Sequence, residues 1–104
     1  MTQPLAERTA FITGGSRGIG RAIALKLGTA GCHVAILYHN SHEEAENVCR
    51  SIREMGRRAM AIQADVGDPD SLVEAFVAFR EQFDRVDLVI SNAALGVLKP
   101  ALEL

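Results

Sequence analysis

The sequence predicts an α/β fold in which an open parallel β-sheet lies between helices on both faces. Short apolar runs alternate with stretches whose apolar residues recur at helical spacing, which is the pattern of repeated βα units. A length of 104 residues suits a single domain with one modest core. Right-handed crossovers through four strands and three helices predict a doubly wound sheet with strand order 3-2-1-4 in three αβα layers.

The first βα unit is predicted over residues 9–30. Residues 9–13 are short and apolar, as a buried parallel strand should be. The helix over residues 18–30 is expected to bury one broad face made of Ile19, Ala22, Ile23, Lys26 and Leu27. Gly28 weakens this helix by about 1 kcal/mol relative to alanine, and Gly31 ends it.

The second unit begins with a strand over residues 33–38. Ser41 and Glu44 have the spacing of a capping box, in which each side chain bonds the other residue's backbone amide. The helix that follows is expected to face the sheet with Ala45, Val48, Cys49, Ile52 and Met55, and Gly56 ends it.

The third unit begins with a strand over residues 59–64. Asp68 is expected to cap the next helix, with Pro69 at its first position, where a missing amide costs nothing. The inner face of this helix is expected to comprise Leu72, Phe76, Phe79 and Phe83, supported by Val73. Residues 86–90 form the fourth strand, which would be an exposed apolar edge.

Composition restricts the possible partners. The 11 basic and 13 acidic side chains give a net charge of -2. This balance does not predict the basic surface that binding to nucleic acid or an anionic membrane requires. Residues 1–7 lack the pattern of a secretory signal, and no run approaches the ~20 apolar residues of a membrane helix, so we expect a cytoplasmic protein. Cys32 and Cys49 are expected to be reduced core thiols. The three histidines are expected in turns and on the surface, and no metal site is predicted.

A glycine-rich motif joins the first strand to the first helix. Its residues are Thr13, Gly14, Gly15, Ser16, Arg17, Gly18, Ile19 and Gly20. Gly14 permits a tight turn, Gly18 lets the backbone approach a pyrophosphate, and Gly20 lets the helix press against the strand, while the helix amides face the phosphates. The alternatives are a turn that serves packing alone, or a P-loop, which is disfavoured because no Gly-Lys-Ser/Thr closes the motif.

The TGxxxGxG spacing resembles the short-chain dehydrogenase/reductase family, whose nucleotide-binding half has a Rossmann-type fold. Two further segments match the family. The resemblance implies that Asp65 accepts from the adenine amino group, that the Val66 amide binds a ring nitrogen, and that Asn92, Ala93 and Ala94 line the ribose. Where the family usually has Asn-Asn-Ala-Gly, this chain has Ser91 and Ala94 at the first and last positions.

The end of the second strand indicates which nicotinamide cofactor is bound. A site for NAD places a carboxylate there, whereas this chain has Tyr38, His39, Asn40 and Ser41, none of them acidic. Arg17 can pair with a 2′-phosphate, and family members with an arginine at this point usually prefer NADP. We therefore expect NADPH as the cofactor, with Tyr38 and Ser41 beside its ribose. The alternative for Arg17 is a solvated surface charge.

The resemblance implies hydride transfer to a carbonyl or enoyl substrate. The stretch over residues 92–100 is similar to one branch of NADPH-dependent enoyl-acyl-carrier-protein reductases, and 3-oxoacyl-carrier-protein reductases are related. The family's catalytic serine, tyrosine and lysine have no match here, since Tyr38 lacks a lysine four residues on. We therefore expect a chain truncated before the catalytic half of an enzyme that is a tetramer or dimer. The alternatives are a non-catalytic dinucleotide-binding or sensor module, and a damaged reductase.

Overall fold

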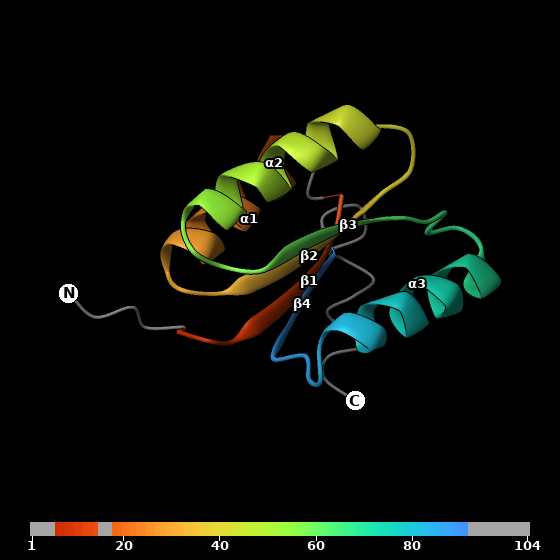
Figure 1. The fold of residues 1–104 in the computed structure, drawn as a ribbon. Helices are drawn as coiled ribbons and strands as arrows, with labels where there is room; N and C mark the ends of the chain where they lie inside the picture. The colour runs from red at the N-terminus through yellow and green to blue at the C-terminus, as the bar shows by residue number, and fades with distance from the viewer. Residues whose placement is uncertain (1–5, 15–17, 92–104) are drawn as a thin grey trace.

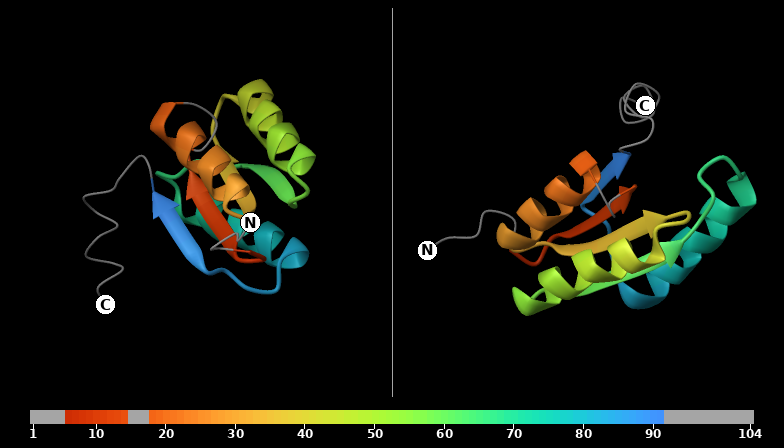
Figure 2. Two further views of the ribbon diagram at one scale, coloured as in Figure 1. Left: turned by 90° about the vertical axis from the view of Figure 1, so that its left-hand side faces the viewer. Right: turned by 90° about the horizontal axis from the view of Figure 1, so that it is seen from above.

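A computed structural model describes residues 6–14 and 18–91. Within these residues the elements run β1 (Thr9–Thr13), α1 (Gly18–Thr29), β2 (His33–Tyr38), α2 (His42–Glu54), β3 (Ala59–Gln63), α3 (Pro69–Gln82) and β4 (Leu88–Ser91). The strands pair in parallel in the order β3-β2-β1-β4. Helices α1 and α2 cover one face and α3 covers the other (Figures 1 and 2). The predicted fold class and strand order are confirmed.

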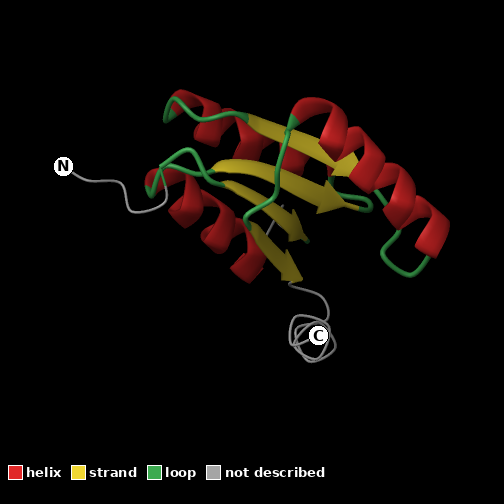
Figure 3. Cartoon of the chain, turned by 90° about the horizontal axis from the view of Figure 1, so that it is seen from below, coloured by secondary structure: helices red, strands yellow, loops and turns green. Residues whose placement is uncertain are grey.

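The two central strands divide their side chains between two cores. Because neighbouring residues of a strand point to opposite faces, Ile12 and Ile36 pack beneath α1 and α2, whereas Phe11 and Leu37 pack against α3. Burial on both faces explains why β1 and β2 are apolar without alternation. The four strands point the same way, so their carboxyl ends share one edge of the sheet (Figure 3).

Helix α1 turns a face toward the sheet that differs from the predicted one. Its fully buried residues are Gly20, Ala24 and Gly28, spaced four apart. Ile19 is 69% exposed, and Ala22 is also exposed. The prediction for these two residues is wrong because periodicity favours large apolar side chains, whereas small residues let the helix backbone approach its neighbours closely.

Helix α2 buries four of the five predicted residues, Ala45, Val48, Cys49 and Ile52. Met55 instead lies just beyond the helix as its C-cap and is 39% exposed. Its sulfur covers Gly28, where an added Cβ would lie 3.0 Å from Met55 Sδ and 3.2 Å from Ile52 Cγ1. Gly28 thus lets α1 and α2 approach closely without pressing on Met55 and Ile52, which offsets its cost in helix propensity.

Helix α3 begins as predicted, since the Asp68 carboxylate accepts from the Asp70 amide at 3.1 Å and Pro69 follows the cap. Phe79 and Phe83 are buried, as predicted. Val73 is 63% exposed, so its predicted place on the inner face is wrong. Phe76 is 42% exposed, but its ring meets Phe11 of β1 edge-on with centroids 5.8 Å apart. Phe76 therefore faces the sheet but is covered only in part by the described residues.

The fourth strand begins two residues later than predicted. The Asp87 amide donates to the Thr9 carbonyl at 2.8 Å, and the ladder with β1 then runs from Ala10 opposite Leu88 to Thr13 opposite Ser91. Val86 precedes this pairing and packs against the core beneath α3 instead. Within the described residues β4 is an edge strand with Val89 38% exposed, in agreement with the expected exposed edge.

Charged side chains join the amino ends of the strands. The Asp87 carboxylate accepts from the Thr9 amide at 2.8 Å and pairs with Arg85 and Arg8. The Thr9 hydrogen bond, followed by the Arg85 charge, lowers the pKa of Asp87. His33 Nε2 lies 2.9 Å from Glu7, and Nδ1 accepts from the Arg58 amide at 2.9 Å. His33 thus joins the strand ends and is not the turn or surface residue predicted.

The two cysteines are buried and reduced, as predicted. Burial raises the pKa of the Cys49 thiol to about 11, because a thiolate would lose its hydration among apolar neighbours. Burial also raises the pKa of Cys32. Both side chains therefore contribute to packing in their protonated form.

Candidate dinucleotide-binding site

The candidate site lies along the edge formed by the carboxyl ends of the strands. Thr13 of β1 is paired with Leu37 of β2 on one side and with Ser91 of β4 on the other. Helix α1 begins at Gly18, directly after the turn that follows β1. Parallel sheets of this kind bind ligands at this edge, where the strand order reverses between β1 and β4.

Two described glycines, on either side of residues 15–17 in the glycine-rich motif, have positive φ angles. Gly14 has φ 69° and Gly18 has φ 62°, backbone angles that residues with a side chain rarely adopt. The Gly14 amide donates to the Leu37 carbonyl at 2.9 Å, which holds the start of the turn against β2. A Cβ added at Gly18 would meet none of the described atoms within 4 Å, so a ligand can approach the backbone there.

The Thr13 hydroxyl is a buried polar group at this edge. Its Oγ1 has no hydrogen-bond partner among the described residues, and a buried hydroxyl without a partner costs free energy. Thr13 lies between Leu37 and Ser91 at the last rung of the ladder. The hydroxyl can therefore bond to a group that comes to the carboxyl ends of β1 and β4.

The end of β2 carries an aromatic pair and no carboxylate. The Tyr38 hydroxyl lies 2.7 Å from His42 Nδ1. Ser41 is the N-cap of α2, but its side chain makes no capping hydrogen bond, so the predicted capping box is wrong. The Ser41 ψ angle of 55° departs from the extended backbone usual at an N-cap, and the hydroxyl does not reach the first amides. Glu43 and Glu44, which follow His42 in α2, are exposed.

The end of β3 places Asp65 in an ordered turn. Asp65 Oδ1 accepts from the Gly67 amide at 2.9 Å, and the Asp65 amide donates to Ser71 Oγ at 2.8 Å. Asp65 is exposed, and Val66 is 47% exposed. One carboxylate oxygen thus orders the turn, while Oδ2 has lone pairs to offer a ligand. Ser71 and Gly67 were not identified from the sequence, because a serine in the first turn of a helix has many ordinary roles.

Several predicted site residues cannot be compared with the structure. Ser16, Arg17, Asn92, Ala93 and Ala94 lie outside the described residues. Within the described part, Thr13, Gly14 and Gly18 come together after β1, with Ile19 and Gly20 in the first turn of α1. The other described candidates lie at the ends of β2 and β3: Tyr38 is the last residue of β2 and Ser41 follows it, while Asp65 and Val66 follow β3.

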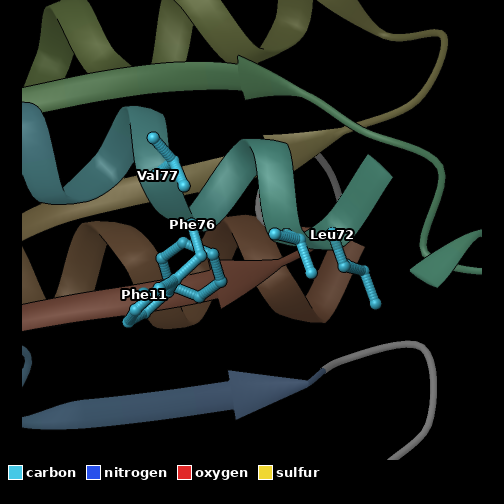
Figure 4. A pocket seen from close by; sticks show the side chains of 5 residues that line it. Phe11, Leu72, Phe76 and Val77 are labelled. Carbon is cyan, nitrogen blue, oxygen red and sulfur yellow. The ribbon is translucent and has the colours of Figure 1, made fainter. Parts of the chain in front are cut away.

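An apolar groove of about 410 Å³ lies elsewhere, between β1 and the flank of α3. Its lining consists of Phe11, Leu72, Val73, Phe76 and Val77 (Figure 4). The rings of Phe11 and Phe76 meet edge-on with centroids 5.8 Å apart. With no polar side chain in its lining, this groove offers nothing to orient a dinucleotide.

The part of the chain that the structure describes has neither a metal-binding cluster nor a membrane-spanning helix. No three histidine, cysteine, aspartate or glutamate side chains lie close enough together there to hold a metal ion. None of the described helices has the length and apolar character needed to cross a membrane.

Comparison with known proteins identifies the family to which this chain belongs. The family model for short chain dehydrogenases matches residues 8–104. Versicolorin reductase stcU of Emericella nidulans is 46% identical over 91 residues, which cover 88% of this chain and 34% of that protein. Hydroxynaphthalene reductase arp2 of Aspergillus fumigatus is 43% identical over 103 residues, covering 96% of this chain and 37% of that protein.

A bacterial relative and a solved structure agree with the fungal matches. The 3-oxoacyl-[acyl-carrier-protein] reductase FabG of Staphylococcus epidermidis is 41% identical over 89 residues, covering 86% of this chain and 36% of that protein. A putative dehydrogenase from Burkholderia cenocepacia with bound NADP superposes with a TM-score of 0.80 at 29% identity, covering 88% of this chain and 36% of that one. The chain spans about a third of the length of these relatives. On its sequence and strand order, the chain belongs to the short-chain dehydrogenase/reductase family and corresponds to the N-terminal, nucleotide-binding part of its members.

Proposed function

We propose that this chain binds NADPH along the carboxyl ends of β1, β2 and β3. In this proposal it supplies the cofactor-binding part of an oxidoreductase. The observation that carries the choice of NADPH is the end of β2, where Tyr38 and His42 meet and residues 38–42 contain no carboxylate. A carboxylate at this point would grip a ribose 2′-hydroxyl and repel a 2′-phosphate. The relative from Burkholderia cenocepacia that has bound NADP supports the same choice.

The described residues fit a dinucleotide along the whole edge. The positive φ at Gly14 and Gly18 and the open space beside Gly18 suit a pyrophosphate lying on the backbone at the start of α1. The buried Thr13 hydroxyl has a hydrogen bond to offer. In this proposal Asp65 accepts from the adenine amino group and the Val66 amide donates to a ring nitrogen. Ser16, Arg17, Asn92, Ala93 and Ala94 complete the contacts on the strength of sequence alone.

The reaction we propose is hydride transfer to a substrate carbonyl. When bound, NADPH supplies the hydride, and this chain's residues hold its adenosine half and pyrophosphate. Relatives named as versicolorin, hydroxynaphthalene and 3-oxoacyl-[acyl-carrier-protein] reductases support this reading. They favour a ketone over the enoyl substrate that the stretch over residues 92–100 suggested. A hydroxynaphthalene-like compound and a carrier-bound 3-oxoacyl chain are the two substrate classes to compare.

No catalytic residue is proposed within this chain. Its one tyrosine, Tyr38, is hydrogen-bonded to His42 and has no lysine four residues on. We propose that residues 1–104 form one nucleotide-binding domain and that the acid-base groups belong to the other two thirds seen in the relatives. A reading frame that continues into a Tyr-x-x-x-Lys segment would support this division. A frame without one would favour the alternative, a non-catalytic dinucleotide-binding module.

The cofactor proposal is tested by binding. We expect the purified chain to bind NADPH more tightly than NADH, as measured by titration with nicotinamide fluorescence. Arg17→Ala should weaken NADPH binding by about 1.5–3 kcal/mol, because it removes a charge-assisted contact to the 2′-phosphate. The affinity for NADH should remain almost unchanged. Arg21→Ala, an exposed arginine one turn further along α1, is the matched control. Equal binding of both cofactors before and after the change would contradict the choice of NADPH.

A further inference from the structure

His33 joins three segments at the amino ends of the strands, the edge of the sheet opposite the candidate site. It is the first residue of β2 and is paired with Thr9 of β1. Its Nε2 lies 2.9 Å from Glu7 Oε2, in the segment before β1. Its Nδ1 lies 2.9 Å from the amide nitrogen of Arg58, in the turn before β3. The side chain is only 13% exposed, and both ring nitrogens have partners within the chain.

These two contacts assign the position of the proton on the neutral imidazole. A backbone amide can only donate, so Nδ1 must accept from Arg58 and carries no proton. A neutral imidazole has one N–H group, which is therefore on Nε2 and donates to the Glu7 carboxylate. A second proton can be added only at Nδ1, where it would face the Arg58 N–H group. Protonation of His33 and the hydrogen bond from Arg58 therefore exclude each other.

Glu7 is held in a conformation that needs its contacts. Its φ of 65° is left-handed, which costs a residue with a side chain about 1–2 kcal/mol. Its amide donates to the Gly31 carbonyl at 3.1 Å, and its Oε1 lies 2.6 Å from Arg57 Nη1. The His33 hydrogen bond, followed by the His33 charge, lowers the pKa of Glu7, so this carboxylate stays ionised while an imidazole titrates. A proton on His33 makes the bond to Glu7 charge-assisted and stronger.

Charged side chains from each neighbouring segment lie at this edge of the sheet. Ion pairs join carboxylates to arginines there: Glu7–Arg57, Arg8–Asp87 and Arg85–Asp87. The Arg58 guanidinium instead lies 4.5 Å from the centre of the Phe83 ring and donates to the Gln82 carbonyl at the end of α3. A protonated His33 is therefore attracted by Glu7 and repelled by Arg58. Both effects favour keeping the Glu7 contact and giving up the Arg58 contact.

We propose that His33 is a pH-sensitive latch between β2 and the turn before β3. Protonation at Nδ1 releases the Arg58 amide, while the Nε2–H bond to Glu7 is kept and strengthened. Because the Arg58 side chain reaches the end of α3, release also loosens the link between this turn and that helix. The latch is independent of the proposed cofactor, since His33 and Tyr38 lie at opposite ends of β2.

Amide exchange measured by NMR on the purified chain tests the latch. Protection factors, which correct for the intrinsic effect of pH on exchange, are compared at about pH 8 and about pH 5.5, a range in which imidazoles ordinarily titrate. We expect the Arg58 amide to lose about threefold to tenfold in protection at the lower pH, as for one neutral hydrogen bond. The Ala64 amide, which donates to the Tyr38 carbonyl at the other edge, should lose less than about twofold. An equal loss at both amides would indicate general loosening and refute the latch.

A matched pair of variants assigns the response to His33. In His33→Asn, the asparagine Oδ1 can accept from the Arg58 amide but does not titrate, so the protection of that amide should be the same at both pH values. His39→Asn removes an exposed histidine just beyond the other end of β2 and should retain the wild-type response. Circular dichroism verifies the fold of both variants. A response that persists in His33→Asn, or one that disappears in His39→Asn, would overturn the inference.

The ¹⁵N spectrum of the wild-type imidazoles gives a reading that needs no variant. At about pH 8 the proton of His33 should be on Nε2, with Nδ1 as an unprotonated acceptor. On acidification Nδ1 should gain its proton over the same pH range in which the Arg58 amide loses protection. A proton on Nδ1 at the higher pH contradicts the latch, as does a His33 ring that stays neutral until the chain unfolds.

Discussion

At the scale of single residues, Asp65 shows how neighbours prepare a candidate contact. Its amide is bonded to Ser71 Oγ at 2.8 Å and its Oδ1 to the Gly67 amide at 2.9 Å. A Cβ at Gly67 would lie 3.3 Å from Oδ1, so the small residue there permits this tight turn. The sequence indicated Asp65 through its place after a strand, but not the two residues that orient it, because their bonds depend on how α3 packs against β3.

This arrangement leads to a prediction about the base of the cofactor. If the Asp65 carboxylate accepts from the adenine amino group, the wild-type chain should prefer NADPH to its hypoxanthine analogue, which lacks that group. Asp65→Ala should weaken NADPH binding by about 1.5 kcal/mol and remove the preference for NADPH over the hypoxanthine analogue. Asp70→Ala removes an exposed carboxylate from the same end of α3 and should preserve the preference. A preference that survives in Asp65→Ala would show that another group reads the base.

At the scale of elements, helix α1 shows where periodicity misleads. Large apolar side chains such as Ile19 suggested one face, but the helix buries Gly20, Ala24 and Gly28. The close packing of α1 on its neighbours is a property of the assembled pair of helices, so a pattern of hydrophobic size cannot reveal it. Four of the five residues predicted for the inner face of α2 are buried, and Val48, Cys49 and Ile52 themselves fill the core.

Gly28 gives this explanation a direct test. Gly28→Val should destabilise the chain by about 1–3 kcal/mol, because its methyl groups would overlap Met55 and Ile52. Ala22→Val, at an exposed position of the same helix, changes helix propensity without that overlap and is the matched control. Urea unfolding followed by circular dichroism measures both. Equal stability of the two variants would mean that α1 and α2 can separate without cost.

At the scale of the whole molecule, the apolar groove and the β4 edge are adjacent surfaces. Val73 and Val77 are more than half exposed and Phe76 nearly so, and Val89 of β4 is 38% exposed. The described residues thus leave an apolar surface uncovered on the α3 face beside the β4 edge.

Acid stability is a further property of the whole molecule. The pKa of Asp87 is lowered in the folded chain by the Thr9 amide and then by Arg85, so its contribution to stability is present above the unfolded pKa of about 3.9 and is lost as the pH falls below that value. Asp87→Asn should lower the Tm at pH 7, and the difference from wild type should shrink below about pH 4. Asp84→Asn, exposed in the same loop, should leave Tm almost unchanged. A constant difference between pH 7 and 3 would rule out this linkage.

The sequence by itself determined the fold class and the strand order. These follow from local patterns: apolar runs, a glycine motif between strand and helix, and the chirality of crossovers. It also indicated most positions around the candidate site, because ligands meet such sheets at the strand ends.

Only the tertiary structure showed that α1 buries a face of small residues and that the Ser41 side chain does not cap α2. It also showed the hydrogen bond between Tyr38 and His42. It likewise revealed the bonds of Ser71 to Asp65 and of Asp87 to Thr9. The physical reason is common to all five. Each depends on atoms that the assembled layers bring within a few ångströms, and hydrogen bonds and close packing act only at that range.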